Sequence, residues 1–410
     1  MSNHTLRSGF ILLCIGLWPT WLAGQSQIPE TCEWFLEETQ RFGAADGEDA
    51  LTGILDLEVG PDGNVFLAQR FGAGVTILTP DGETTVLGRA GRGPGEFDGP
   101  PLRLGFIGDT LWASDRLTVH FFGPDGAELR QVSFRTATGH GSRFVPRVPL
   151  ADGSFLGDRQ IDPSSMREFV EATRLPLHRF SASGEVLDPV TLIRAPPVVT
   201  IEGGGFTFHP LGDWLGESML PVAVEPDGRA VVTAGTTQNA AADAFFLTRV
   251  DITGDTILHR SIPYEPAPVN ASDREWLTEA FAGSLAGDHD PAVSRTRDDA
   301  ARERQRRAAR EAITFPDYFP PVRQVVPGAD GSIWLLRELE LPQRTDRWEV
   351  YGATGDLEGV VRVTEGRAFQ DPWKPRLKML WASRDQVWAS SLGELDVPYL
   401  HRFRVVRGCD

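Results

Sequence analysis

One short pattern recurs along the chain and limits the fold more than any other feature. A turn containing Asp, usually Asp-Gly, is followed at once by a short apolar strand. Asp can bond to its own backbone and Gly accepts a positive φ, so such turns favour tight hairpins. The six apolar strands are 65–68, 111–114, 154–157, 230–233, 333–336 and 387–390. The repetition therefore predicts a series of β-hairpins rather than a helical protein.

Each repeat also contains further strands. Another apolar strand precedes the turn, as at 54–59, and a second hairpin follows in most repeats, as at 75–78 with Pro80-Asp81-Gly82. Two successive hairpins make a four-stranded antiparallel sheet, which is the blade of a propeller. We therefore predict an all-β, six-bladed β-propeller with four-stranded antiparallel blades and a helical insertion, 264–319, between blades four and five.

The last repeat lacks a fourth strand, because 399–406 reads as the third and the sequence then ends. The segment 32–38 is available to close the last blade as its missing strand. In an antiparallel sheet this places Cys32 beside Cys409, so we expect a disulfide between them in place of a hairpin turn. Two unpaired thiols are the alternative.

The N-terminal segment has the pattern of an export signal. Arg7 precedes an apolar run, 10–23, which ends in small residues before a polar stretch. We predict a signal peptide at 1–24, a single propeller domain at 25–410, and a periplasmic or extracellular location. The run is shorter than the roughly twenty residues that cross a bilayer as a helix, so no transmembrane span is expected in the mature chain. An uncleaved anchor is the alternative.

Composition supports this class and excludes one group of partners. The 43 Gly and 30 Pro residues suit many tight turns. The formal net charge of −17 argues against nucleic acid as a partner. We expect a monomer.

A loop after the first repeat carries a family resemblance. The stretch 88–97 contains Gly-Pro-Gly-Glu-Phe, and Leu-Trp-Ala-Ser-Asp follows at 111–115. Over about residues 50 to 135 the chain resembles bacterial exported six-bladed β-propellers with NHL-type repeats. The resemblance implies the fold, with this loop joining one blade to the next. It implies no function, because such propellers share no single activity.

Long segments between strands mark one face of the predicted propeller. Because strands in a blade alternate in direction, the long segments 158–174, 194–220, 264–319 and 338–347 all emerge on the same side. Long loops on a rigid scaffold are where binding residues tend to lie. This face is therefore the predicted functional face.

Polar residues end the second strand of most repeats at that face. Arg side chains match carboxylate and phosphate groups, so a ring of them would suit a polar or anionic ligand. We predict a binding or interaction module for a protein, peptide or small polar ligand. The alternative is that these residues pair with one another and close the blade ends. The ring consists of Arg70, Asp115, Arg116, Asp158, Arg159 and Arg337.

The largest insertion contains helical sequence. Ser272 is a predicted N-cap with Glu275 three residues later. The segment 298–313 is rich in helix formers and in arginine. It is interpreted as a lid or docking arm, or as a solvated helix.

Evidence for catalysis in the sequence is thin. Some six-bladed propellers are metal-dependent lactonases or esterases, and oxygen ligands near the predicted face are Glu96, Asp115, Asp158, Asp213, Glu217 and Asn239. No spacing singles these residues out, so we predict no metal or other cofactor and no enzyme activity. The alternative function is a metal-dependent hydrolase or lyase with Ca²⁺ or a similar cation at the channel mouth. The histidines at 120, 178, 259 and 401 fall in predicted outer strands and are expected to be structural.

Overall fold

The computed structural model is mostly β-strand with few helices. It describes residues 32–44, 47, 50–115, 117–134, 138–139, 142–160, 174–194, 201–203, 206–208, 222–236, 243–286, 299–312, 317–337, 346–363, 377–393 and 397–408. The predicted signal peptide, 1–24, lies outside this part of the chain, and so do most residues of the segments 158–174, 194–220 and 338–347.

Three sheets are built from two consecutive hairpins each, with every neighbouring pair antiparallel. In each, the first strand in the chain lies at one edge of the sheet and the fourth at the other. The first is β2 (Ile54–Val59), β3 (Val65–Gln69), β4 (Val75–Leu78) and β5 (Thr84–Leu87). The second is β8 (Arg103–Ile107), β9 (Thr110–Ser114), β10 (Thr118–Phe122) and β11 (Glu128–Ser133). Another is β21 (Val222–Val224), β22 (Ala230–Gly235), β23 (Ala244–Asp251) and β24 (Thr256–Pro263).

A fifth strand and several two-stranded ladders depart from that pattern. The five-stranded sheet is β12 (Thr138–Gly139), β13 (Ser142–Pro149), β14 (Phe155–Gln160), β16 (Arg179–Phe180) and β17 (Val186–Leu187). The ladders are β15 (Arg174–Pro176) with β18 (Leu192–Arg194), β19 (Ile201–Gly203) with β20 (Phe206–Phe208), and β6 (Arg89–Ala90) with β7 (Glu96–Phe97). The last of these lies within the loop that carries the family resemblance.

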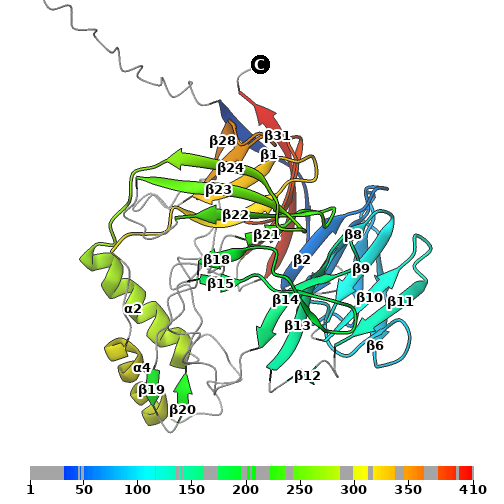
Figure 1. Cartoon of the computed structure of the whole chain (residues 1–410), viewed down its shortest axis with the longest axis horizontal. Helices are drawn as coiled ribbons and strands as arrows, with labels where there is room; N and C mark the ends of the chain where they lie inside the picture. The colour runs from blue at the N-terminus through cyan, green and yellow to red at the C-terminus, as the bar shows by residue number, and fades with distance from the viewer. Residues whose placement is uncertain are drawn as a thin grey trace, which may run out of the picture. The chain divides into compact units, whose positions relative to one another are not determined.

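The remaining strands form one eight-stranded sheet that contains both ends of the described chain. Its order is β25 (Val322–Pro327), β26 (Ile333–Arg337), β27 (Asp346–Tyr351), β28 (Leu357–Val363), β1 (Glu33–Phe42), β31 (Pro398–Arg407), β30 (Gln386–Leu392) and β29 (Lys378–Ala382). The first strand runs antiparallel to the last, with Trp34 opposite Arg407 and Phe42 opposite Leu400. Figure 1 shows the two side by side, β1 in blue and β31 in red.

The start of β1 also pairs with the preceding sheet, which the sequence did not predict. Glu33 lies opposite Val360 and Trp34 opposite Val361 in a short parallel ladder with β28. The Trp34 ring is buried and lies 6.1 Å from the ring of Trp334. A single N-terminal strand therefore joins two four-stranded halves into one sheet.

The Asp residues of the turns act as the sequence predicted. Asp62 and Asp330 each accept a hydrogen bond from the backbone N–H two residues later, at 3.1 Å in both turns. The glycine after Asp62, Gly63, has a φ of 81°, which favours glycine over other residues. Side chain and backbone together close the hairpins that repeat along the chain.

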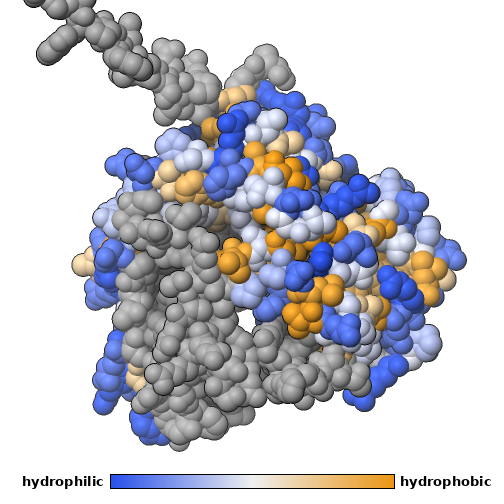
Figure 2. Space-filling view, in the orientation of Figure 1, coloured by the Kyte–Doolittle hydropathy of each residue, from blue (hydrophilic) through white to orange (hydrophobic). Residues whose placement is uncertain are grey.

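Apolar residues pack between successive sheets. One buried cluster joins β3 to β8 and β9, and similar clusters join each following pair of sheets. The cluster around Leu57 and Val65 also contains Trp388 and Leu400, so the last sheet packs against the first. Face-to-face packing of this kind is propeller-like. Over the coloured part of the face in Figure 2, the remaining apolar residues are interspersed with polar ones.

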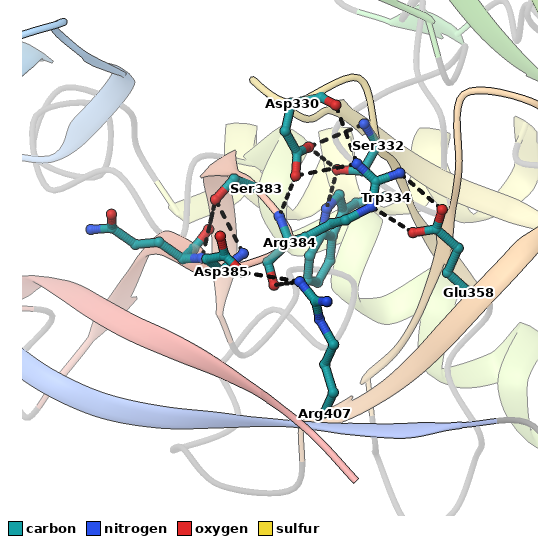
Figure 3. A network of polar contacts seen from close by, with 9 residues as sticks. Asp330, Ser332, Trp334, Glu358, Ser383, Arg384, Asp385 and Arg407 are labelled. Carbon is teal, nitrogen blue, oxygen red and sulfur yellow. Dashed lines mark hydrogen bonds and ion pairs between the residues drawn. The ribbon is translucent and has the colours of Figure 1, made fainter. Parts of the chain in front are cut away.

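Ion pairs near the turns connect neighbouring sheets. Figure 3 shows Arg384, in the turn between β29 and β30, directed at Glu358 of β28 and at Asp330 of the preceding hairpin. Its guanidinium donates to Glu358 at 2.6 and 2.9 Å, and its backbone N–H donates to Asp330 at 2.8 Å. In the same way Arg260 of β24 donates to Asp356 at 2.6 Å. These contacts hold the sheets in register with one another.

Two helices are described between β24 and β25. They are α2 (Ala271–Ala286) and α4 (Asp299–Ala312), and Arg310 of α4 forms a two-bond ion pair with Glu279 of α2. The predicted cap was wrong: Asn270 accepts a hydrogen bond from the backbone N–H of Asp273 at 3.0 Å, so α2 begins earlier than a cap at Ser272 allows. Among the described residues, no helix is long and apolar enough to span a membrane.

Candidate active site

The first strands of the hairpin sheets surround one cavity of about 640 Å³. Residues of β2, β8, β13, β21, β25 and β29 line it. Hydrogen bonds tie neighbouring walls together: Leu104 N–H donates to Asp56 at 3.1 Å, and the Gln324 amide donates to the Met379 carbonyl at 3.0 Å. The cavity is therefore an internal feature of the packed sheets and not a gap between loops.

The strands that line the cavity are irregular. Register shifts occur in β2, β13, β25 and β29, each opposite the second strand of its own hairpin. Such bulges bend a strand and redirect a side chain, and they are common beside active sites. In β25 the shift lies between Val322 and Gln324, at the position of Arg323.

Two carboxylic acids stand on one wall of the cavity. Asp56 and Glu58 alternate with apolar residues in β2, and residues two apart in a strand project to the same side. Asp56 accepts the hydrogen bond from Leu104 of the next sheet, and Glu58 accepts one from the Val59 N–H at 3.2 Å. Both acids are part of the cavity wall, where water or a ligand can reach them.

The environments of the two acids differ in charge. Burial is the main cause that raises the pKa of Glu58 to about 8; the negative charge of Asp56 adds to the rise, and the Val59 N–H and Trp381 oppose it. Burial also raises the pKa of Asp56 on balance, and Arg103 and Lys378 offset part of this rise. Glu58 therefore holds a proton at neutral pH, and Asp56 differs from it in having two cations that favour its ionised form.

Three cationic side chains line the same cavity. Arg103 begins β8 and Lys378 begins β29, while Arg323 is the second residue of β25 and is 6% exposed. The Arg103 guanidinium lies 3.9 Å from the Asp56 carboxylate, and the Lys378 ammonium donates to the Leu55 carbonyl at 3.4 Å. Positive charge is thus concentrated where these strands begin.

The rest of the lining is largely apolar. Side chains deeper along the same strands include Phe106 and Trp381, and Trp112 comes from the second strand of its hairpin. A concave site in which polar groups converge beside apolar and aromatic side chains is the usual form of a small-molecule site.

The ring of polar residues predicted from the sequence does not form this site. None of the described members lines the cavity. Asp115 is 3% exposed and accepts hydrogen bonds from the N–H groups of Leu117 and Thr118, which closes its own loop. Arg337 is paired with Glu349 at 2.9 Å, and Arg70 is exposed. Arg116 and the side chains of Asp158 and Arg159 lie outside the described residues.

The described oxygen ligands that were considered for a metal have other contacts. Glu96 accepts hydrogen bonds from the N–H groups of Arg92 and Gly93 and so shapes its own loop. Asp213, Glu217 and Asn239 lie outside the described part of the chain. Within that part, no group of three or more His, Cys, Asp or Glu residues is placed to hold a metal ion. No step below uses a divalent cation.

A second titratable cluster has a structural role. His120 is 1% exposed and lies 2.8 Å from Glu128 and 3.8 Å from Asp115. Glu128 also accepts a hydrogen bond from the Gly95 N–H at 2.6 Å, and the ring of Phe97 lies 4.5 Å from the imidazole. The cluster fixes the Gly-Pro-Gly-Glu-Phe loop against β10.

Comparisons with known proteins find solved structures of similar architecture at low sequence identity. No family model and no curated protein matches the sequence. Virginiamycin B lyase from Staphylococcus aureus is similar with a TM-score of 0.42 and 9% identity, over 91% of this chain and 100% of that one. A gluconolactonase from Xanthomonas campestris gives 0.39 and 12%, over 90% and 98%. A luciferin-regenerating enzyme gives 0.38 and 9%, over 90% and 95%.

These similar structures are propellers, in agreement with the packing described above. They also correct one prediction. The non-enzymatic binding module was wrong, because the structures that the chain resembles are a lyase, a lactonase and a further enzyme. At such low identities and TM-scores, what those proteins act on is not carried over. Any specific activity has to be argued from the cavity itself.

Sequence reasoning missed the residues that line the cavity. The signal was present in β2, where Ile-Leu-Asp-Leu-Glu-Val carries acids at alternate positions of an otherwise apolar first strand. In a propeller the first strand of each blade is the innermost, so its polar side chains face the centre. The sequence-based prediction used the polar residues at the ends of the second strands, and it therefore placed the site among the loops.

Proposed function

We propose that the chain is a hydrolase of the lactonase or esterase kind, which cleaves a carbon–oxygen bond by general acid–base catalysis in the cavity. The observation that carries the proposal is the pair Asp56 and Glu58 on one cavity wall, with cations beside the first only. Pairs of acids whose environments separate their pKa values divide the roles of base and acid between them.

The pair suits the two proton transfers of hydrolysis. Asp56 takes a proton from water as the water oxygen bonds to the carbonyl carbon. Glu58 gives its proton to the leaving oxygen as the carbon–oxygen bond breaks, so an acid and an alcohol are formed. The two residues are spaced by roughly 7 Å along the strand, which lets them serve different atoms of one substrate. Exchange with solvent then returns both residues to their starting states.

The cations supply the remaining requirement. Negative charge develops on the carbonyl oxygen during attack, and positioned hydrogen-bond donors stabilise it. Arg103 and Lys378 lie at the same end of the cavity, on the strands either side of β2, and are the groups that we assign to this oxygen. No metal is needed for these steps.

We further propose that the scaffold is a six-bladed propeller of the NHL-repeat kind. Support comes from the six first strands that line one cavity and from the cluster that packs the last sheet on the first. In this arrangement β1 completes the last blade beside β31, and 25–410 is one domain.

Export of the chain as a monomer is part of the proposal. Cys32 is disulfide-bonded, which suits an oxidising compartment outside the cytoplasm. Its predicted partner, Cys409, lies outside the described residues. The Gly408 N–H donates to the Glu33 carbonyl at 2.9 Å, and this contact supports the pairing because each residue is next to one of the two cysteines.

The test is a screen of mature protein against lactones, carboxylic esters and substrates prone to elimination, with product analysis. We expect hydrolysis, and Asp56→Asn and Glu58→Gln each to lower its rate by about 10²- to 10⁴-fold. Arg70→Gln is the matched control because Arg70 is exposed and outside the cavity. Elimination products would replace the hydrolase by a lyase. Turnover that survives both acid substitutions would contradict the proposal.

A further inference from the structure

The charge of the cavity differs from that of the whole protein. The formal net charge of the chain is −17, yet among the described residues the cavity lining holds three cations, Arg103, Arg323 and Lys378, beside three acids. Of these acids, Glu225 is already paired with Arg249 at 2.5 Å, and Glu58 holds a proton at neutral pH because its pKa is about 8. Asp56 is then the acid on which Arg103 and Lys378 act.

Two of these cations have donors to spare. The 3.9 Å separation between Arg103 and Asp56 is longer than a hydrogen bond, and the Arg103 side chain is 55% exposed. The Lys378 ammonium has three donors, and its contact with the Leu55 carbonyl, at 3.4 Å, occupies one of them. Donors therefore remain for an anionic group at this end of the cavity.

Arg103 and Lys378 lie at the same end of the cavity because the strands β8 and β29 both begin beside the start of β2. Lys378 bonds to Leu55 near the start of β2, and Leu104 near the start of β8 bonds to Asp56. Apolar and aromatic side chains follow along the strands, among them Phe106, Leu380 and Trp381. The cavity is thus cationic at one end and apolar beyond it.

We propose that the cavity selects small organic anions, with a carboxylate held by Arg103 and Lys378 and an apolar or aromatic body packed against Trp112 and Trp381. The inference rests on the proposed function, because the same cavity is the proposed active site. Its volume of about 640 Å³ admits one molecule of this kind. Substrates are accordingly esters or lactones that carry a second, free carboxylate.

Binding of simple probes tests the selection directly. Phenylacetate, the neutral phenylacetamide and the cationic phenethylamine share a ring and differ in charge, and calorimetry gives the affinity of each for the mature protein. We expect phenylacetate to bind at least 10-fold more tightly than the amide, with the advantage falling as salt is raised. Equal binding of acid and amide would overturn the proposal.

Substitutions locate the binding site. Arg103→Gln and Lys378→Gln should each weaken phenylacetate binding by about 10- to 100-fold, the range for a lost charge-assisted hydrogen bond. Arg103→Lys keeps the charge and should recover part of the affinity, and Arg70→Gln should leave it unchanged. An equal loss in Arg70→Gln, or no loss in either cavity variant, would contradict the assignment. If a cavity variant does not fold, the three probes on the unaltered protein still decide.

The two proposals fail in different ways. If phenylacetate binds selectively but no ester or lactone is hydrolysed, the result supports the anion site and contradicts the hydrolase. If neutral and anionic esters are hydrolysed equally and no anion binds, the result supports the hydrolase and contradicts the anion site.

Discussion

Arg103 of β8 lies 3.9 Å from Asp56 of β2, so a cation of one sheet faces an acid of its neighbour across the cavity wall. The next residue after the arginine, Leu104, donates its N–H to the same carboxylate. One short segment of β8 therefore both orients Asp56 and favours its ionised form. This relationship gives the carboxyl pair in β2 its asymmetry.

Removing that cation should shift the pH dependence of catalysis. Arg103 lowers the pKa of Asp56 against the effect of burial, so Arg103→Gln raises it, by about one unit or more for a lost neighbouring charge. A base works only when ionised, so the acidic limb of kcat/KM should move to higher pH. Arg103→Lys should restore the limb. An unchanged acidic limb in Arg103→Gln would show that Asp56 is not the base.

Glu58 should make stability depend on pH. The pKa of Glu58 rises from its ordinary value of 4.5 to about 8 in the folded protein, so its contribution to stability is complete below 4.5 and is lost as pH rises from 4.5 through 8. Glu58→Gln cannot ionise, and its Tm relative to the unaltered protein should therefore increase from pH 5 to pH 8 and level off above that. Glu83→Gln, at an exposed turn, is the control and should show no such trend. A constant Tm difference would place Glu58 in contact with bulk water.

His120 and Asp115 should contribute to stability with opposite dependences on pH. Burial lowers the pKa of His120, but the nearby carboxylates of Asp115 and Glu128, of which Glu128 is within hydrogen-bond distance of the ring, outweigh burial and raise the pKa overall. The stabilisation is thus full below the ordinary value near 6.5 and is lost as pH rises through the raised one. Asp115, whose pKa is lowered, contributes above about 4 and loses its contribution in acid.

We expect His120→Gln to destabilise the protein by about 2–4 kcal/mol, because it removes the buried, partly charged ring that lies between two carboxylates. Urea unfolding should show a larger loss at pH 5.5 than at pH 8.5. His259→Gln is the control, since His259 is exposed and bonds to Thr248. Equal losses at both pH values would mean that His120 is neutral in the folded protein.

The proposed disulfide makes a separate prediction. A thiol assay on the denatured, unreduced mature protein should find no free thiol, because Cys32 and Cys409 are its two cysteines. Cys32→Ser should lower the free energy of unfolding by about 2–5 kcal/mol, the usual cost of losing a native disulfide. Two titratable thiols would contradict the pairing.

Much of the scaffold could be predicted because its signals are local. In several turns, as at Asp62 and Asp330, the Asp side chain accepts a hydrogen bond from the backbone N–H two residues later, and the apolar strand follows directly. The predicted N-cap of α2 was wrong because three neighbouring residues, Asn270, Ser272 and Asp273, are all of types that cap helices. Which of them caps the helix depends on the path of the chain from β24.

The site could not be predicted in the same way because its signals are not local. Acids at alternate positions, as in β2, are also typical of a strand with one face exposed to solvent. Only the packing of the last sheet on the first, around Trp388 and Leu400, puts that face toward a central cavity. Arg103 and Lys378 are distant in sequence from Asp56, and their approach follows from the same closure.

The proton on Glu58 is the centre of the proposed mechanism, and infrared difference spectroscopy measures it without knowledge of the substrate. The spectrum of the unaltered protein minus that of Glu58→Gln isolates the carbonyl stretch of this one carboxylic acid. A band of the protonated acid at pH 7 that disappears as pH rises through about 8 is the predicted result. A carboxylate at pH 7 that titrates only in acid would contradict the assignment of Glu58 as the catalytic acid.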